Sequence, residues 1–405
     1  MTRKLTHVDC FAGPGGICTG FHAAGLETLV AVELVESCVE TYQANHNDVH
    51  VINKDIRDVK DEEVQKVIGN REVDILTAGM PCETFSTAGS SSRSFYDHRQ
   101  HLYREAIRLA SAVDAKMILF ENVPGIQTKT VEKGGERLIV EEIYDDLAQA
   151  GYIYHVQTQL NAMSFGVPQS RERFFILASR EERNLRVPVA NQAEFVSVDE
   201  AFKNLPEPQE TLNTLKKKQV KGIEVAPEPY LTIDSDYTRL MRNTEFWQFG
   251  QEQRDVTYHV APAHRPNTVQ RLALVAPGEG LKDLFFKFEP EEVERLQQEG
   301  ILPKKWYIQR NRRLIANQPS VTVTSHCLDE LVHPIKHRAI TVREAARLQS
   351  FPDFYDFKGG KYVMPHNDPQ QDKYEQIGDA VPPLLAYHWG LVIKEIFEGV
   401  MEESK

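Results

Sequence analysis

The chain is short of the features that mark several large protein classes. It has 405 residues but only five cysteines, and no two of them form a C-x-x-C pair. No apolar run approaches the length of a membrane-spanning helix, and the first residues do not have the pattern of a signal peptide. The sequence therefore argues against a disulfide scaffold, a zinc site and a membrane protein. We expect a reduced, cytoplasmic protein without a metal.

An excess of basic charge is also missing. The net charge of −12 argues mildly against a nucleic-acid partner, although a nucleic acid contacts only one face of a protein. Basic clusters do occur, at residues 216–221 and 304–313. A solvated surface is the simpler interpretation of each cluster taken alone. Net charge therefore leaves the partner open.

The first part of the chain has the pattern of an α/β protein. Strand-like segments alternate with helix-like ones up to about residue 185, which predicts a doubly wound, mostly parallel sheet with helices on both faces. The strand-like segments are residues 5–11, 28–34, 49–52, 73–79, 117–123 and 173–179. From there the alternation stops, and a helical pattern returns at 341–351 and 381–400. We predict three parts, with residues 1–185 as the catalytic and cofactor-binding domain, 186–335 as an irregular second domain, and 336–405 as a C-terminal segment.

A glycine-rich turn follows the first strand. The segment AGPGG contains Gly13, Gly15 and Gly16, which let a ligand approach the backbone, and it opens a helix whose N-terminus favours an anionic group. Glu33 ends the second strand, where a carboxylate meets ribose hydroxyls in nucleotide-binding folds, and Asp55 follows the third. The turn lacks the P-loop pattern. Together these features favour an adenosyl ligand over a structural turn.

Two residue types with reactive side chains end the next two strands. Pro81-Cys82 follows the fourth strand, at the sheet edge where such folds place their sites. A lone buried cysteine is more often inert, but the proline before it and the long polar loop after it favour a rigid nucleophile beside a lid. Glu121 closes the fifth strand, as a helix cap, a salt-bridge partner or, near Cys82, a proton donor. The cysteines expected in the core are Cys10, Cys18 and Cys38.

The segment QSRERFF opens the last predicted strand. Alternation places Gln169, Arg171 and Arg173 on one face of it. Two arginines on one face could simply be exposed to solvent. Beside a nucleophile and an acid, they are candidate donors to a base carbonyl and to phosphates.

Taken in order, these motifs resemble those of DNA (cytosine-5)-methyltransferases of the bacterial restriction-modification type. The motifs are DCFAGPGGICTGF, the PC of MPCETFS, ENV, QSRERFF, TVREAARLQSFPD and QIGDAVPP, and they cover roughly residues 5–180 and 318–390. The resemblance implies a Rossmann-like fold that uses S-adenosyl-L-methionine. It also implies that 186–335 is a target-recognition domain and that 336–405 returns to complete the catalytic domain.

The resemblance assigns a role to each matching residue. Cys82 is the expected nucleophile at a flipped-out cytosine, Glu121 the acid at ring nitrogen 3 and Arg173 the donor to the carbonyl oxygen, with Arg171 beside it. The expected cofactor-binding residues are Phe11, Gly13, Gly15, Gly16, Glu33, Asp55, Ile56, Pro81, Leu102, Asp379 and Val381. The expected DNA-binding residues are Ser86, Gln169, Lys304, Lys305 and Arg310. The second domain is predicted to read bases in the major groove, with His259 and Arg271 among its candidates.

Two positions depart from the family pattern. Glu83 stands where the family usually has Gln, and Asp379 where it usually has Asn. Neither departure removes a reacting group.

The resemblance also implies the partners of the protein. We expect a monomeric, nucleoid-associated enzyme that acts on double-stranded DNA, with a cognate restriction endonuclease acting separately.

Two alternatives stay open. An RNA cytosine-5 methyltransferase would share this catalytic domain, although the CFT tripeptide of the tRNA-acting branch is missing. An inactive DNA-binding accessory subunit would be expected to lose Cys82, Glu121 or Arg173, and all three are present. An amino-methylating enzyme is disfavoured because the sequence contains no Asn/Asp-Pro-Pro-Tyr/Phe motif.

Overall fold

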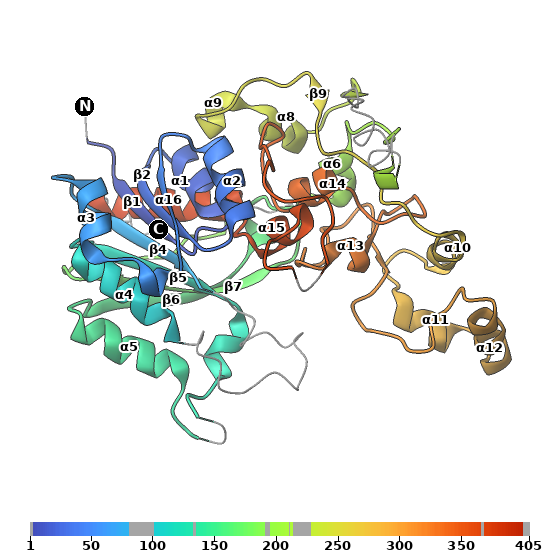
Figure 1. Ribbon diagram of the computed structural model, residues 1–405, viewed down its shortest axis with the longest axis horizontal. Helices are drawn as coiled ribbons and strands as arrows, with labels where there is room; N and C mark the ends of the chain where they lie inside the picture. Colours follow the sequence, from blue (N-terminus) through green and yellow to red (C-terminus); the bar gives the residue numbers. More distant parts are fainter. Residues whose placement is uncertain are drawn as a thin grey trace, which may run out of the picture.

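A seven-stranded sheet forms the centre of the protein in the computed structural model (Figure 1). The structure describes residues 3–80, 101–132, 135–190, 195–209, 211–213, 228–365 and 368–399. The strand order is β3-β2-β1-β4-β5-β7-β6, and β7 runs antiparallel to both of its neighbours. The strands are β1 (Thr6–Cys10), β2 (Glu27–Glu33), β3 (His50–Asn53), β4 (Ile75–Gly79), β5 (Met117–Asn122), β6 (Tyr154–Asn161) and β7 (Glu172–Ser179). The predicted fold class is confirmed.

Helices cover both faces of the sheet, and each face has its own hydrophobic core. On one face, α1 (Gly16–Ala23) and α16 (Pro383–Glu398) bury Phe21 and Trp389 against Met117 of β5. On the other, α3 (Asp61–Ile68), α4 (Tyr103–Ala112) and α5 (Ile139–Gln149) bury Ile107 and Ile143. The remaining helix of this part, α2 (Glu36–Asn45), follows β2. Burial on both sides explains why β4 and β5 are mostly apolar, whereas β1 is equally buried but includes Thr6, His7 and Asp9.

The strand β6 has no counterpart among the predicted strands. Its side chains alternate between exposed and half-buried, and polar residues fill most of its length. It lies at the sheet edge beside β7, so one face of it contributes little to the core. A weak alternation of this kind does not stand out in the sequence.

The C-terminal segment packs back onto the start of the chain. A Cβ atom on Gly20 of α1 would lie 2.2 Å from the carbonyl oxygen of Pro383, and one on Gly390 would lie 2.6 Å from Cβ of Ala24. Only glycine allows α1 and α16 to approach this closely. Two shorter helices precede α16, namely α14 (Val342–Leu348), which begins with a capping box at Thr341, and α15 (Lys373–Asp379). The C-terminal segment is thus part of the sheet domain's own core.

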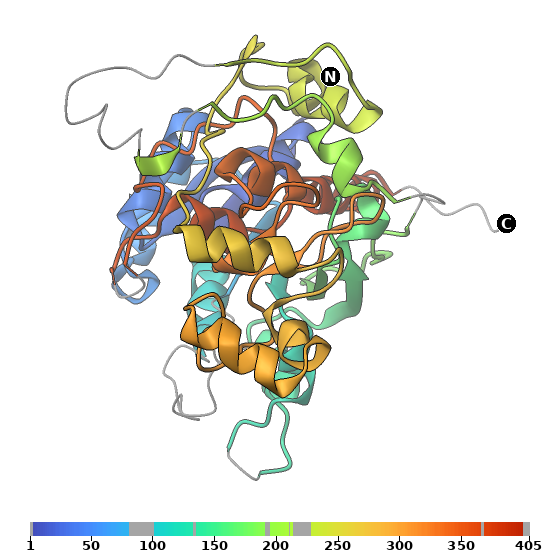
Figure 2. The ribbon, with the colours of Figure 1, turned by 90° about the vertical axis from the view of Figure 1, so that its right-hand side faces the viewer.

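The predicted second domain is made of short elements, some packed beside α1 and others extending away from the sheet (Figures 1 and 2). The helices are α6 (Val198–Phe202), α8 (Asp236–Arg242), α9 (Thr244–Trp247), α10 (Pro266–Leu274), α11 (Leu281–Lys287), α12 (Pro290–Gln298) and α13 (Cys327–Glu330). The strands form two pairs, β8 (Glu228–Pro229) with β9 (Asp255–Val256) and β10 (Arg312–Arg313) with β11 (Leu331–Val332). Met241 and Trp247 share a continuous core with the sheet, whereas α11 and α12 enclose a separate small one. Only the second of these two regions is packed as an independent unit.

Candidate active site at the carboxyl edge of the sheet

The glycine loop is fixed to the end of β2 by Glu33. The loop turns back on itself, with positive φ angles at Phe11 (56°), Gly13 (55°) and Gly15 (98°). The backbone N–H of Gly13 donates to Oε2 of Glu33 at 2.8 Å, and the N–H of Val35 donates to Oε1 at 2.8 Å. Burial raises the pKa of Glu33. A nearly buried carboxylate therefore stands directly beside the predicted cofactor loop, as the sequence placed it.

Gly16 has a packing role. A Cβ atom there would lie 2.2 Å from the carbonyl oxygen of Val381, so the start of α1 presses against the segment before α16. Two predicted cofactor residues that are 365 positions apart in sequence are therefore in direct contact. Gly16 is required for this approach whether or not a ligand is bound.

Two aromatic residues that the sequence analysis missed support the loop from behind. The hydroxyl of Tyr355 donates to the carbonyl oxygen of Pro14, and it would lie 2.8 Å from a Cβ atom on Gly15. His46 shares a hydrogen bond of 3.0 Å with the hydroxyl of Thr19, which in turn donates to the carbonyl of Gly15 at 2.7 Å. Tyr355 lies two residues after the motif TVREAARLQSFPD, but only the packing shows where its side chain lies.

The buried His46 predicts a measurable dependence of stability on pH. Desolvation, helped by His22, lowers the pKa of His46 to about 3. The unfolded chain binds a proton near pH 6.5, whereas the folded chain does not until about pH 3. The contribution of neutral His46 to the free energy of unfolding is therefore complete above about pH 6.5. It is lost as the pH falls from about 6.5 to about 3, at about 1.4 kcal/mol per pH unit.

We expect the variant His46→Gln to be less stable than wild type near neutral pH but to lose stability less steeply on acidification. Urea unfolding of both proteins between about pH 8 and about pH 5 measures the two slopes. The exposed substitution His50→Gln serves as the control. Parallel pH profiles for wild type and His46→Gln would show that this histidine is not held neutral.

The other predicted cofactor residues differ in their exposure and in their hydrogen-bond partners. Asp55 accepts hydrogen bonds from the backbone and guanidinium of Arg57, which lower the pKa of its carboxyl group. Ile56 is buried, and Leu102 packs half-buried against the same core. Asp379 is exposed, and one of its oxygens accepts from Gln371 at 2.9 Å. Asp55 would have to share its carboxylate between Arg57 and a ligand.

Glu121 and Arg173, the predicted acid and the predicted donor to the base carbonyl, form an ion pair. Nε of Arg173 lies 2.8 Å from Oε1 of Glu121, and about a tenth of each side chain is exposed. Gly79, the last residue of β4, pairs in register with Glu121, and a Cβ atom on it would lie 3.7 Å from Oε2 of Glu121 and 4.0 Å from the carbonyl oxygen of Phe11. The glycine loop, the end of β4 and the acid thus meet at one point.

The remaining site predictions on the β4–α4 connection are outside the described residues. These are Pro81, Cys82, Glu83 and Ser86. Gly79 and Met80 lead directly into Pro81, so the chain enters this connection beside Glu121.

The described cysteines are poor nucleophiles. All four are buried, which confirms the prediction for Cys10, Cys18 and Cys38 and assigns Cys327 to the core as well. Burial raises the pKa of Cys18 to about 12 and raises the pKa of the other three thiols. Because the thiolate is the reactive form, none of the four is suited to attack a substrate near neutral pH. The fifth cysteine of the sequence, Cys82, lies outside the described residues.

Two of the three residues predicted on one face of the last strand point inward instead. The side-chain amide of Gln169 donates to the carbonyl of Leu348 at 2.8 Å, and its oxygen accepts from the N–H of Val323 at 2.9 Å. Arg171 is buried and donates to the carbonyls of Val323 and Gly378 at 2.7 and 3.0 Å. The predicted DNA contact of Gln169 and the predicted base or phosphate contact of Arg171 are therefore wrong in this structure. Both precede β7, so the alternation of a strand does not apply to them.

The predicted DNA-contacting residues of the second domain also fall into two groups, one exposed and one held by contacts within the fold. Lys304 and Lys305 are exposed, and Arg310 is exposed but lies 3.0 Å from Asp329. His259 is buried between the hydroxyl of Thr341 and the carbonyl of Pro206, at 2.9 and 2.8 Å. Arg271 is held by Asn311 and the carbonyl of Ile301. His259 and Arg271 therefore stabilise the fold and are not placed to read bases.

Within the described ranges, no group of three or more His, Cys, Asp or Glu side chains is arranged to hold a metal ion. No helix in that part of the chain is long and apolar enough to cross a membrane.

The sheet order and the position of the glycine loop define a Rossmann-like methyltransferase fold. A solved structure of a putative DNA modification methyltransferase encoded within a prophage (E. coli) has a similar fold, with a TM-score of 0.71 and 22% sequence identity. The superposition covers 98% of this chain and 100% of that one. At this identity the likeness establishes the fold.

The sequence comparisons establish the family. The chain belongs to the C-5 cytosine-specific DNA methylases, whose sequence profile matches residues 5–395. It is 29% identical over 399 residues to the type II methyltransferase M.DdeI of Desulfomicrobium norvegicum, with 97% of this chain and 89% of that protein covered. It is also 29% identical to the type II methyltransferase M1.HphI of Haemophilus parahaemolyticus, with 95% and 85% covered. The protein is therefore an enzyme, a DNA cytosine-5 methyltransferase.

Proposed function

We propose that the protein transfers the methyl group of S-adenosyl-L-methionine to carbon 5 of a cytosine that is flipped out of a specific duplex DNA site. The observation that carries the proposal is the meeting of Glu121, Arg173 and the glycine loop at Gly79, directly before Pro81 and Cys82. Addition of a thiolate to carbon 6 makes carbon 5 nucleophilic toward the sulfonium methyl group. A duplex base is accessible to these groups only after it leaves the stack.

The proposed roles of the paired residues come from the resemblance to the family, and their pairing at the edge of the sheet supports them. In the proposal Glu121 donates a proton to ring nitrogen 3, which relieves the charge that develops during the addition. Arg173 orients that carboxyl group through Nε and can offer other guanidinium N–H groups to the carbonyl oxygen of the base. Afterwards the proton on carbon 5 must leave and Cys82 is eliminated. The proposal does not depend on which base removes that proton.

The cofactor site is supported by the fit of the residues at its edge. Glu33 offers carboxylate oxygens next to the loop, as ribose hydroxyls require. A Cβ atom on Gly13 would meet nothing within 4 Å, so the loop is open to a ligand at this residue. Bound S-adenosyl-L-methionine would supply the methyl group as an electrophile. Val381 closes the pocket from the C-terminal segment through its contact with Gly16.

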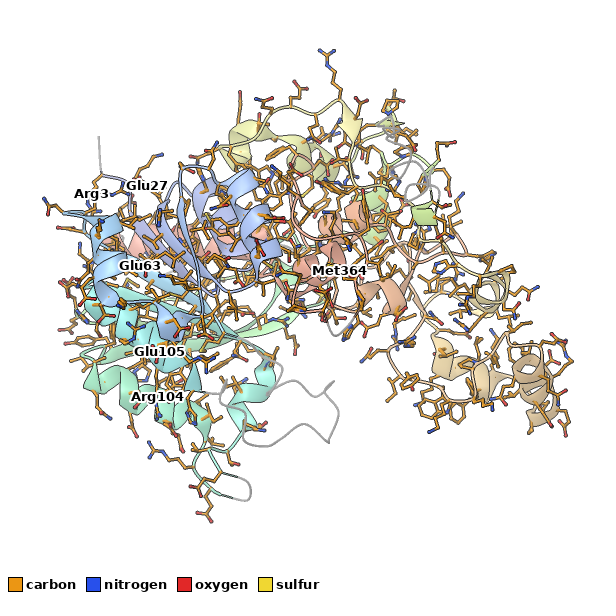
Figure 3. The ribbon with its side chains drawn as sticks, in the orientation of Figure 1. Arg3, Glu27, Glu63, Arg104, Glu105 and Met364 are labelled. Atoms are coloured by element: carbon orange, nitrogen blue, oxygen red, sulfur yellow. The ribbon has the colours of Figure 1, made fainter. Side chains whose placement is uncertain are left out.

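Removing the carboxylate of Glu33 should weaken cofactor binding. We expect Glu33→Ala to raise the dissociation constant of S-adenosyl-L-methionine by about 100-fold, because hydrogen bonds to a charged group contribute about 1.5–3 kcal/mol each. Isothermal titration calorimetry measures the constant without requiring activity. Glu27→Ala is the matched control on the same strand; Glu27 lies at the opposite end of β2, beside Arg3 in Figure 3. Equal affinities for Glu33→Ala and wild type would remove Glu33 from the cofactor site.

Bisulfite sequencing of DNA from cells expressing the protein tests the activity and reveals the target site together. We expect one short sequence to be methylated throughout the genome, as for the modification enzyme of a restriction-modification system or an orphan methylase. A parallel assay with duplex DNA and tRNA separates this function from RNA methylation. Methylation of tRNA alone, or of neither substrate, would contradict the proposal.

A further inference from the structure

The glycine loop has a backbone conformation that its own residues do not favour. Phe11 has a φ of 56°, in the left-handed region that a residue with a bulky side chain rarely adopts. Such a conformation persists only where the surrounding structure holds it in place. Towards β2 the loop is held by two backbone N–H groups, that of Ala12 on the carbonyl of Val32 at 3.2 Å and that of Gly13 on Glu33 at 2.8 Å. The rest of the loop needs support from elsewhere in the chain.

Two side-chain hydroxyl groups supply that support at Pro14 and Gly15, which are both buried. The hydroxyl of Tyr355 donates to the carbonyl of Pro14, and the hydroxyl of Thr19 donates to the carbonyl of Gly15 at 2.7 Å. A hydroxyl group has only one proton, so Nε2 of His46, 3.0 Å from Oγ1 of Thr19, must be the donor in that contact. Two consecutive carbonyl groups of the loop are therefore fixed by side chains.

The ring of Tyr355 is itself held by a buried aromatic cluster. Its centroid lies 4.7 Å from that of Phe351 and 5.2 Å from that of Phe357. Phe249 packs against both supporting side chains, with centroid distances of 5.0 Å to His46 and 6.3 Å to Tyr355. Close packing of this kind leaves the hydroxyl of Tyr355 a single direction. Because Phe249 belongs to the predicted second domain, all three predicted parts of the chain meet behind the loop.

We propose that Tyr355 is a positioning residue for the cofactor, because its hydroxyl holds the peptide group of Pro14 and so keeps the loop in the shape that receives S-adenosyl-L-methionine. A Cβ atom on Gly13 would meet nothing within 4 Å, whereas one on Gly15 would lie 2.8 Å from the hydroxyl of Tyr355. The loop is thus open to a ligand at Gly13 and closed at Gly15, and Tyr355 acts on the ligand through the loop. The inference rests on the proposed function and adds to it a residue that determines cofactor affinity.

The variant Tyr355→Phe of the full chain removes the hydroxyl and keeps the packed ring. Tyr152→Phe is the matched control, because Tyr152 is also buried and its hydroxyl also donates to a backbone carbonyl, that of Ala115 at 2.7 Å. Tyr152 lies in the core on the other face of the sheet. Both variants leave one carbonyl without its donor, so urea unfolding should show a similar loss of stability for each. Isothermal titration calorimetry with S-adenosyl-L-methionine then measures what is specific to the loop.

Tyr355→Phe should raise the dissociation constant of S-adenosyl-L-methionine about tenfold, equivalent to about 1.4 kcal/mol, whereas Tyr152→Phe should bind it like wild type. In methylation assays the effect should fall on KM for the cofactor and not on kcat, because the hydroxyl does not touch the reacting groups. A second pair of variants tests the same support without disturbing the aromatic cluster. Thr19→Val should also weaken cofactor binding, and Thr19→Ser, which keeps the hydroxyl, should restore it.

The outcomes distinguish this inference from the proposed function. If wild type binds S-adenosyl-L-methionine and Tyr355→Phe binds it equally well, the inference is wrong and the function stands. Equal weakening by Tyr355→Phe and Tyr152→Phe would overturn the inference, because a general loss of stability would then account for both. A lower kcat with an unchanged KM would place the hydroxyl at a later step and would overturn it as well. If wild type does not bind the cofactor at all, the proposed function fails first.

Discussion

The variant Cys82→Ser should lose methyl transfer by more than 1,000-fold while still binding S-adenosyl-L-methionine, because a hydroxyl group is a far weaker nucleophile than a thiolate. The four other cysteines cannot replace it, since burial raises the pKa of each thiol. Transfer of tritiated methyl groups to the target duplex measures the loss. Calorimetry with the cofactor shows that the fold and the cofactor site are intact.

A trapping experiment tests the covalent step itself. A duplex with 5-fluorocytosine at the target position should form a stable adduct with wild type, because fluorine blocks the final elimination. The adduct should be absent with Cys82→Ser and present with Cys327→Ala, which removes a thiol from the buried core. Normal turnover by Cys82→Ser, or no adduct with wild type, would contradict the mechanism.

The variant Glu121→Gln should lower kcat by about 100-fold to 10,000-fold, the range expected when a general acid is removed. Glutamine keeps the shape of the side chain and an oxygen that can accept from Nε of Arg173, so the fold around the pair should be preserved. The missing element is a proton that can be donated to the base. The effect should therefore fall on kcat at saturating DNA and cofactor, with little change in DNA affinity.

A neighbouring carboxylate provides the matched control for Glu121. Glu172 also lies at this end of the sheet, but it is exposed and accepts from Gln159 at 3.1 Å. Glu172→Gln should turn over like wild type. A kcat for Glu121→Gln within about threefold of wild type would assign the ion pair with Arg173 a structural role only, since general acid catalysis contributes at least about 100-fold.

The inward position of Arg171 changes how its loss should be understood. Its guanidinium joins the segment before β7 to the carbonyls of Val323 and Gly378, close to Asp379 and Val381. A substitution there would loosen the C-terminal side of the cofactor site, because a buried carbonyl would lose its donor. Arg173, two residues further on, lies beside Glu121 instead. The two arginines of one motif therefore act on different parts of the site.

The sequence alone was sufficient to predict those parts of the protein that are encoded by residues close together in the chain. The alternation of apolar strands and amphipathic helices predicted the parallel sheet, because most strands that are buried on both faces are rich in apolar residues. The glycine loop, Glu33 and Glu121 were identifiable because the carboxyl ends of parallel strands meet at one edge, whatever the details of packing. The approach of Glu121 and Phe11 to Gly79 follows from the strand order, because β4 lies between β1 and β5.

Tertiary structure alone decided the features that depend on contacts between distant segments. Gln169 and Arg171 turn inward because their partners come from residues 323–380, and the sequence spacing of the motif is the same for an exposed or a buried side chain. Tyr355 reaches Pro14 across 341 positions, and the edge strand β6 is paired in spite of its weak alternation. Periodicity records which face of an element is buried, whereas the partner that buries it is set by packing of the whole chain.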